Sequence, residues 1–188
     1  MRADARRNHA CLLAVARIAF EENGADASLE EIAHRAGVGS GTLYRHFPTR
    51  ESLLEAVLRE WTESMQAEAE GFLAHSSPSK ALHAWLRSYI SHITVYRGLA
   101  TALMASMQEK SSALYGCGQS VKNASADLLT RAQKADEIRG DVDIADVLKL
   151  VKGIALAAEQ PGGDDLAERL LAVVMDGLRT HPSAPMPA

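Results

Sequence analysis

Apolar residues recur at intervals of three and four along most of the chain, a period that is typical of amphipathic helices. Glycine, proline, serine and aspartate stand between the periodic segments, where helices begin or end. The pattern therefore predicts an all-α protein of about nine helices. We expect these helices over residues 4–23, 28–36, 40–47, 49–74, 80–96, 99–108, 119–138, 143–159 and 164–180.

The first predicted helix carries an apolar stripe at positions i, i+4, i+7 and i+8, which is formed by Cys11, Val15, Ile18 and Ala19. Phe20 adds a bulky anchor beside this stripe. We therefore expect Cys11 to lie in the core of a small domain that this helix forms with the next two. Arg6 and Arg7 precede the stripe. They either reach DNA phosphates or form a solvated basic start of the helix.

Residues 28–47 read as two short helices joined by a tight turn. Ser28 is a good N-cap, and Glu31 three residues later completes a capping box. Gly37 fits the position after the first helix, where a positive φ is needed. The second helix starts near Ser40 and ends before Pro48. This is the helix-turn-helix pattern, whose second helix lies in the major groove of DNA.

The second short helix has an inward and an outward face. Leu43 and Phe47 are four residues apart, so both are expected to face the core. The outward residues are Thr42, Tyr44, Arg45 and His46. Threonine and arginine can contact bases, and tyrosine and histidine can bond phosphates. By itself, the same face could also be an ordinary polar surface.

Three short motifs carry a family resemblance. Ala36-Gly37-Val38, Gly41-Thr42-Leu43-Tyr44 and His46-Phe47 resemble the DNA-binding signature of the TetR family of transcriptional regulators, and the resemblance runs from about Arg6 to Arg59. Family members often carry Ser-Lys where this chain has Gly39-Ser40, and a basic residue at the place of Arg50 binds the DNA backbone in the family. The predicted DNA-binding residues are Arg6, Arg7, Ser28, Gly39, Ser40, Gly41, Thr42, Tyr44, Arg45, His46 and Arg50.

The net charge of −4 means that the chain is not basic overall, so a DNA-binding surface has to be local. Basic residues gather at the N-terminus and around the second short helix: Arg2, Arg6, Arg7, Arg35, Arg45 and Arg50. Acidic residues, Glu30 among them, are expected elsewhere on the same domain. A localised basic face is therefore the predicted footprint on DNA.

The helix over 49–74 begins at Thr49, which is a plausible N-cap. It is expected to connect the helix-turn-helix domain, residues 1–47, to a larger ligand-binding and dimerisation domain, residues 48–180. Such a helix could carry a movement from one domain to the other. The proline-rich tail, residues 181–188, is expected to be disordered.

The larger domain offers a candidate ligand site. Aromatic rings with polar tips follow one flank of the helix over 80–96, and two methionines follow on the helix over 99–108. The predicted ligand-binding residues are Trp85, Tyr89, His92, Tyr96, Met104, Met107 and Tyr115. The last of them begins a glycine-rich stretch, 115–118, that we expect to be a loop. This wall favours a small, mainly apolar molecule. The alternative is an ordinary contact between helices.

The last two predicted helices favour a symmetric homodimer. The helix over 164–180 is apolar on two sides, and a terminal helix of this kind buries one side against its own domain and the other against a partner. Gly153 permits close approach of another helix. The predicted dimer-interface residues are Val147, Val151, Ile154, Leu166, Leu170, Val174 and Leu178.

Several protein classes are disfavoured. The sequence has no run of 18 apolar residues and no apolar signal core, so we expect a cytoplasmic protein without membrane contact. Cys11 and Cys117 are the only cysteines, so a disulfide framework is not expected. No HExxH, GxSxG, P-loop or dinucleotide motif occurs, so we expect no enzyme, no cofactor and no metal site.

The function that the sequence favours is a ligand-responsive, sequence-specific regulator of transcription. Its expected partners are a double-stranded DNA operator, a small-molecule effector and a second copy of the chain. The family resemblance favours a repressor that its effector releases from DNA. The alternative is a helical scaffold that has lost DNA binding, because Gly39 and Ser40 replace the usual contact residues.

Overall fold

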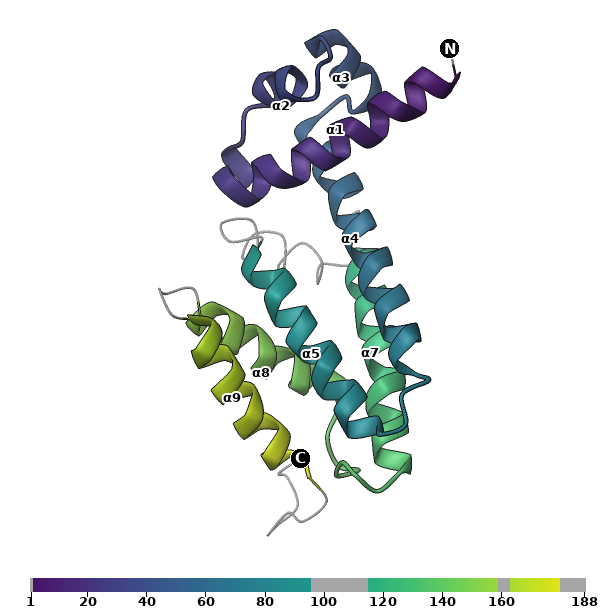
Figure 1. Ribbon diagram of the computed structural model, residues 1–188, viewed down its shortest axis with the longest axis vertical. Helices are drawn as coiled ribbons and strands as arrows, with labels where there is room; N and C mark the ends of the chain where they lie inside the picture. The colour runs from purple at the N-terminus through teal and green to yellow at the C-terminus, as the bar shows by residue number, and fades with distance from the viewer. Residues whose placement is uncertain (1, 96–114, 159–162, 180–188) are drawn as a thin grey trace. The chain divides into compact units, whose positions relative to one another are not determined.

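The computed structural model of the chain describes residues 2–95, 115–158 and 163–179 (Figure 1). Its regular secondary structure in these residues is helical and includes no β-strand, which confirms the predicted all-α class. The predicted helix over 99–108 and the tail over 181–188 lie outside the described residues. The helices are α1 (Arg2–Asn23), α2 (Leu29–Arg35), α3 (Ser40–His46), α4 (Arg50–Phe72), α5 (Pro78–Val95), α7 (Tyr115–Lys134), α8 (Ile144–Ala157) and α9 (Gly163–Gly177), with a short 3-10 turn, Gly24–Asp26, after α1.

The described residues group into two compact units. The first unit holds residues 2–62 and Tyr115–Gly118, and the second holds residues 63–95 with the described residues from 119 onward. α4 runs without a break from Arg50 to Phe72, so it contributes residues to both units. The domain division that we predict at residue 47 stays a prediction.

α1 packs into the first unit through a face that lies one residue away from the predicted stripe. Its buried face is Leu12, Ala16, Ala19 and Phe20. The predicted core position of Cys11 is therefore wrong: the residue is exposed, and its Sγ donates to the Ala36 carbonyl at 3.5 Å. Ile18 is likewise 38% exposed. Both faces have the same helical spacing, so spacing alone could not choose, and the larger leucine and phenylalanine occupy the core.

α5 begins at Pro78, two residues before the predicted start at 80. Proline suits the first turn of a helix, because its missing N–H would have no helical partner there. The buried stripe of α5 is formed by Leu82, Leu86, Ile90 and Ile93. Figure 1 shows α5 beside α8 and α9, the two helices against which it packs in the second unit.

α8 follows its prediction closely. Asp143 caps the helix, because its carboxylate accepts the backbone N–H of Ala145 at 2.6 Å. The apolar residues along one side of α8 and at its C-cap are buried in the second unit: Ile144, Val147, Leu148, Val151, Ile154, Ala155 and Ala158.

The start of α7 differs from its prediction. We predict a loop for residues 115–118, but the structure includes them in the helix. Glycine costs about 1 kcal/mol per helical residue relative to alanine. That local cost is outweighed here, because the rest of the helix is firmly packed and buries Val121, Leu128 and Ala132.

The end of α7 also differs, because the helix stops at Lys134 and not near 138. Asp136 adopts a φ of 56°. Its N–H and that of Glu137 bond back to carbonyls of the last helical turn at 3.0 and 3.1 Å. Glycine usually occupies this left-handed position, so the sequence lacks the customary signal for a helix end.

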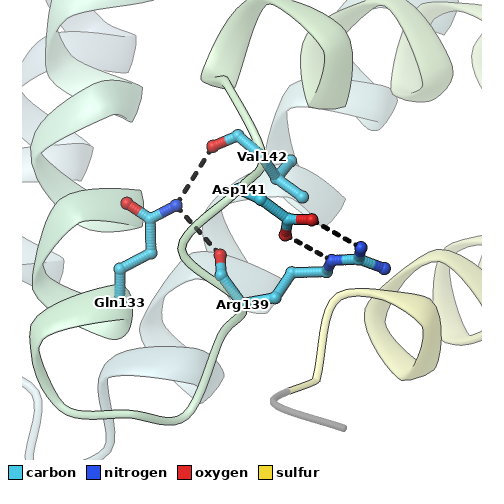
Figure 2. Close-up of polar contacts among 4 residues, drawn as sticks. All are labelled: Gln133, Arg139, Asp141 and Val142. Carbon is cyan, nitrogen blue, oxygen red and sulfur yellow. Dashed lines mark hydrogen bonds and ion pairs between the residues drawn. The ribbon is translucent and has the colours of Figure 1, made fainter. Parts of the chain in front are cut away.

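The turn between α7 and α8 is held by polar contacts, which Figure 2 shows. The side-chain amide of Gln133 donates to the carbonyls of Arg139 and Val142 at 3.1 and 3.0 Å. The guanidinium of Arg139 forms two bonds to the carboxylate of Asp141, at 2.6 and 2.7 Å. The backbone N–H of Arg139 donates to the Leu178 carbonyl at 2.9 Å. The turn at 139–141 is thus held by its own polar contacts and is also joined to the end of α9.

A distant carboxylate caps the start of α5. Glu137 accepts the backbone N–H of Ser79 at 2.8 Å and the hydroxyl of Ser77 at 3.4 Å. Hydrogen bonds from Ser79, followed by the one from Ser77, lower the pKa of Glu137 below its ordinary value. Nearby, the guanidinium of Arg131 donates to the His75 carbonyl. Together these contacts fasten the end of α7 to the start of α5.

Candidate nucleic-acid interface

The turn between α2 and α3 has the predicted geometry. Ser28 caps α2 by accepting the backbone N–H of Glu31 at 3.3 Å. Gly37 has a φ of 70°, and two N–H groups after the helix bond back to carbonyls of its last turn, each at 3.0 Å. No atom lies within 4 Å of the place where a Cβ on Gly37 would stand. The backbone conformation, and not a lack of space, therefore requires glycine.

α3 is anchored by the two residues that the sequence predicts, since Leu43 is 0% and Phe47 is 4% exposed. Gly39 stands at the N-cap in an extended conformation. The predicted contact residues of α3 remain accessible to different degrees: Ser40, Gly41, Tyr44 and Arg45 are exposed, and Thr42 and His46 are half-buried. The structure thus brings the predicted base-contacting and phosphate-contacting side chains together on one short helix.

The start of α4 is firmly held. Thr49 and Ser52 form a reciprocal cap, in which each side-chain oxygen accepts the other residue's N–H, at 3.1 and 3.2 Å. Arg50 donates from Nη1 to the Ala27 carbonyl at 2.6 Å. Arg50 therefore has a structural contact with the segment that precedes α2, besides its predicted contact with a phosphate.

Glu30 lies among the predicted contact groups and not elsewhere on the domain, which corrects our expectation for this acid. The hydroxyl of Ser28 donates to its Oε2 at 3.1 Å, and the hydroxyl of Tyr44 donates to its Oε1 at 3.4 Å. The pKa of Glu30 is lowered, first by its own backbone N–H, then by Ser28 and Tyr44, with a further contribution from the charge of Arg50.

His9 also belongs to this surface, although it is not among the predicted contact residues. Its ring lies 5.0 Å from the ring of Phe47 and 5.7 Å from that of His46, measured between centroids. His9 stands three residues before Leu12, on the face that α1 buries, so the correct stripe would have revealed it. The contact ties α1 to the last turn of α3.

The basic surface is narrower than the one we predict. Arg35 is committed to Glu22 through two bonds of 2.7 and 3.4 Å, and these bonds lower the pKa of the Glu22 carboxyl. Arg7 pairs with Asp4 at 3.3 Å, although both residues are exposed. Because Arg45 is exposed on α3, it remains a basic side chain well placed to meet DNA.

The predicted effector wall is described in part. Trp85 and Tyr89 are buried and stacked, with ring centroids 5.3 Å apart, and the indole N–H of Trp85 donates to the Met65 carbonyl at 3.1 Å. Burial raises the pKa of Tyr89 above its ordinary value. His92 and Tyr115 are half-buried. The remaining predicted residues, Tyr96, Met104 and Met107, lie outside the described residues.

A groove of about 340 Å³ follows another flank of α5. Ile90 and Thr94 line it together with Leu171 of α9. The ring of Trp85 is fully buried, so the stacked aromatic pair belongs to the interior of the second unit.

The predicted dimer residues separate into two groups. Val147, Val151, Ile154 and Leu178 are buried within their own unit, which corrects their placement on an open face. Leu166, Leu170 and Val174 are half-buried. Leu150 of α8 and Val173 of α9 are 55% and 68% exposed. The apolar surface that stays open on these two helices is therefore formed by a different set of α8 residues than we predict.

The described ranges lack two further features, a membrane-spanning helix and a metal-binding cluster. No helix there combines the length and the apolar composition that crossing a bilayer requires. The same residues contain no cluster of three or more histidine, cysteine, aspartate or glutamate side chains that could hold a metal ion.

The capped turn, the anchored seven-residue α3 and its accessible polar side chains define a helix-turn-helix regulator of transcription. Residues 12–57 match the family model described as "Bacterial regulatory proteins, tetR family". Residues 77–180 match the one described as "Transcriptional regulator SbtR-like, C-terminal domain". The chain belongs to the TetR family. It is accordingly a DNA-binding transcriptional regulator and not an enzyme, as the sequence predicts.

Individual relatives agree with this assignment. A TetR transcriptional regulator from Streptomyces coelicolor, known from a crystal structure, is 43% identical in sequence to this chain. The two structures superpose with a TM-score of 0.73, and the match covers 94% of this chain and 99% of that one. A TetR regulator from Mycobacterium vanbaalenii is 34% identical, with a TM-score of 0.69 and coverage of 95% and 98%. The transcriptional repressor KstR2 of Rhodococcus jostii is 28% identical, over 89% of each chain.

Proposed function

We propose that the chain is a sequence-specific repressor that binds its operator as a homodimer and leaves it when a small, mainly apolar effector binds. The observation that carries the proposal is the geometry from α2 through Gly37 to α3, with the polar side chains of α3 accessible. The relative KstR2 of Rhodococcus jostii is a transcriptional repressor, which supports repression over activation as the effect of this chain on transcription.

In the proposed complex, α3 lies in the major groove. Thr42 and Arg45 are the candidates for base contacts, because threonine can touch a thymine methyl group and arginine can form two bonds to guanine. Tyr44, His46 and Arg50 contact phosphates and fix the position of the protein on the duplex. The remaining residues of the proposed interface are Arg6, Arg7, Ser28, Gly39, Ser40 and Gly41.

A dimer supplies the specificity that one α3 lacks. A recognition helix of seven residues covers only a few base pairs, so two half-sites about 34 Å apart are needed for a selective operator. The proposed interface is the open apolar surface of α8 and α9, formed by Leu150, Leu166, Leu170, Val173 and Val174. Gly153 supports it, because the space around its Cβ position is open in the single chain.

The proposed effector site is lined by the predicted set around Trp85, Tyr89 and His92. Rings and sulfur atoms favour a mainly apolar molecule, and the few polar tips favour one or two polar groups on it. α4 contributes to both units without a break, which supports it as the element that transmits the effect. By reciprocity, an effector that lowers DNA affinity binds less tightly to the DNA complex than to the free protein.

Binding of the full chain to DNA tests the proposal. The duplexes are the promoter of its own or a neighbouring gene and a scrambled duplex of equal length. In fluorescence anisotropy we expect the promoter to bind at least about 10³-fold more tightly. Equal affinity for the two duplexes contradicts operator recognition and favours the scaffold alternative.

A charge-matched pair of variants locates the interface. Arg50→Ala should weaken binding to both duplexes and reduce the slope of log affinity against log salt by about 0.9. Arg59→Ala removes the same charge from the same helix, where the side chain is exposed and pairs with Glu55, and should leave the slope unchanged. Thermal unfolding of Arg50→Ala separates this effect from the loss of the bond to Ala27.

A further inference from the structure

Glu30 occupies a position that a regulator of DNA would be expected to keep free of negative charge. Its carboxylate accepts hydrogen bonds from the hydroxyl groups of Ser28 and Tyr44, at 3.1 and 3.4 Å. Arg50 contributes a favourable charge interaction to the same carboxylate. Three residues of the proposed DNA interface therefore converge on a single acid of the protein itself.

Each of the two hydroxyl groups can donate only one hydrogen bond at a time. A tyrosine hydroxyl has one proton, so Tyr44 cannot donate to Glu30 and to a phosphate at the same time. The hydroxyl of Ser28 is committed in the same way, because it donates to Glu30 while its oxygen accepts the backbone N–H of Glu31. A phosphate that takes either hydroxyl must first displace the carboxylate.

Charge acts in the same direction. The residue is exposed, and its carboxylate is ionised at neutral pH, because its ordinary pKa of 4.5 is already well below neutrality and its hydrogen bonds lower that pKa further. An ionised carboxylate repels a phosphate that approaches the same hydroxyl groups. Because this repulsion does not depend on the base sequence, it acts on every duplex, unlike a contact to a base edge.

We propose that Glu30 competes with the DNA backbone for Tyr44 and Ser28 and so lowers the affinity of the protein for any duplex. This inference rests on the phosphate contact of Tyr44 in the proposed function. The effect limits the time that the regulator spends on DNA outside its operator. Selection of the operator is left to other side chains, because the carboxylate weakens both kinds of binding by the same factor.

Two alanine variants test the competition. Glu30→Ala should tighten binding to the promoter duplex and to the scrambled duplex by the same factor, roughly fivefold, which is the size expected for the net contribution of one ordinary hydrogen bond. Glu31→Ala is the matched control, because it removes a carboxylate from the same turn of α2 but keeps the backbone N–H that Ser28 accepts. It should change affinity less than twofold, a difference of about 0.4 kcal/mol.

The role of Tyr44 is read from a double variant. In a Tyr44→Phe background the hydroxyl is absent, so Glu30→Ala should give a clearly smaller gain than in the wild-type background. A gain of equal size in both backgrounds overturns the competition for Tyr44. If Glu30→Ala weakens promoter binding and spares the scrambled duplex, Glu30 reads a base and the proposal is wrong.

A measurement without DNA separates this inference from the proposed function. Carboxyl-detected NMR titration of the free protein should show that Tyr44→Phe moves the pKa of Glu30 up toward its ordinary value. An unchanged pKa contradicts the contact itself. Absence of promoter preference in the wild type contradicts the proposed function instead, and the scrambled duplex still reports on Glu30 in that case.

Discussion

At the scale of single residues, Glu137 should make the stability of the second unit depend on pH. Its folded pKa lies below the ordinary value of 4.5, chiefly because Ser79 donates to it. Such a carboxylate stabilises the fold above its unfolded pKa, and this contribution is lost as the pH falls through the folded pKa. Glu137→Gln should therefore melt at a lower temperature than the wild type at neutral pH, and the difference should vanish in strong acid.

Circular dichroism melting curves from neutral to acid pH provide the measurement. Glu60→Gln is a suitable comparison, because it removes an exposed carboxylate from α4. A difference between Glu137→Gln and the wild type that stays constant down to the lowest pH would show that the carboxylate charge does not support the cap.

Local signals explain which single residues could be predicted. Ser28 and Asp143 cap the helices that directly follow them, and Gly37 provides the positive φ after α2. A few neighbouring residues in the sequence are therefore enough to predict these roles. Asp136 and Glu137 could not be predicted in this way. Asp136 takes a conformation usually reserved for glycine, and Glu137 caps a helix whose residue Ser79 lies 58 positions earlier.

At the scale of elements, the turn between α2 and α3 depends on one glycine. Gly37→Ala places a side chain at a φ of 70°, where an L-residue is strained, although the space beside it is open. We expect a loss of about 1 kcal/mol in the free energy of unfolding. Urea unfolding measures this loss.

Gly41→Ala is the matched variant for this experiment. It adds the same methyl group to an exposed position in α3, with nothing within 4 Å of the new Cβ. It should keep or slightly raise stability, since alanine favours helix by about 1 kcal/mol over glycine. Equal effects of the two substitutions would mean that the conformation of Gly37 carries no cost.

Periodicity predicts that a helix exists more reliably than it predicts which side faces the core. The stripe on α5 is unambiguous, because Leu82, Leu86, Ile90 and Ile93 repeat at spacings of four, four and three. On α1, two faces with equal spacing overlap at Ala19, and the packing of the unit, which no local pattern contains, selects between them. For the same reason the ring contact of His9 with Phe47 could not be predicted, because it depends on which face of α1 lies against α3.

At the scale of the whole molecule, the open apolar surface of α8 and α9 predicts association. Leu170→Arg places a charge in the proposed interface, so the variant should be monomeric at micromolar concentration and should bind the promoter duplex poorly. Sedimentation velocity measures the mass, and wild-type protein that is monomeric under the same conditions would contradict the dimer.

Leu73→Arg serves as the comparison in this experiment. Leu73 is also an accessible leucine of the second unit, but it lies just after α4 and away from the proposed interface. The substitution should therefore leave the mass unchanged. A monomeric Leu73→Arg protein would indicate a general effect of the added charge.

The all-α class could be predicted because helical periodicity recurs along the chain, and the helix-turn-helix could be predicted because its motif lies within one short segment. The open face of α8 and α9 could be predicted only in part. Amphipathicity marks Val151 and Leu170 alike as apolar, but only the packed unit decides that the first is internal and the second stays accessible. The effector class rests on side-chain chemistry alone, since rings such as Trp85 suit many apolar molecules.

The cap that Glu137 forms on α5 has a consequence for the order of events during protein synthesis. Ser79 leaves the ribosome 58 residues before the carboxylate that completes its helix. At usual elongation rates, this separation corresponds to a delay of roughly 3 to 12 seconds. During that interval α5 lacks the two hydrogen bonds that Glu137 accepts at its start, and these bonds form only when the end of α7 has been made. The start of α5 therefore waits until the whole of α7 has been translated, whereas α8 and α9, which complete the second unit, are made later still.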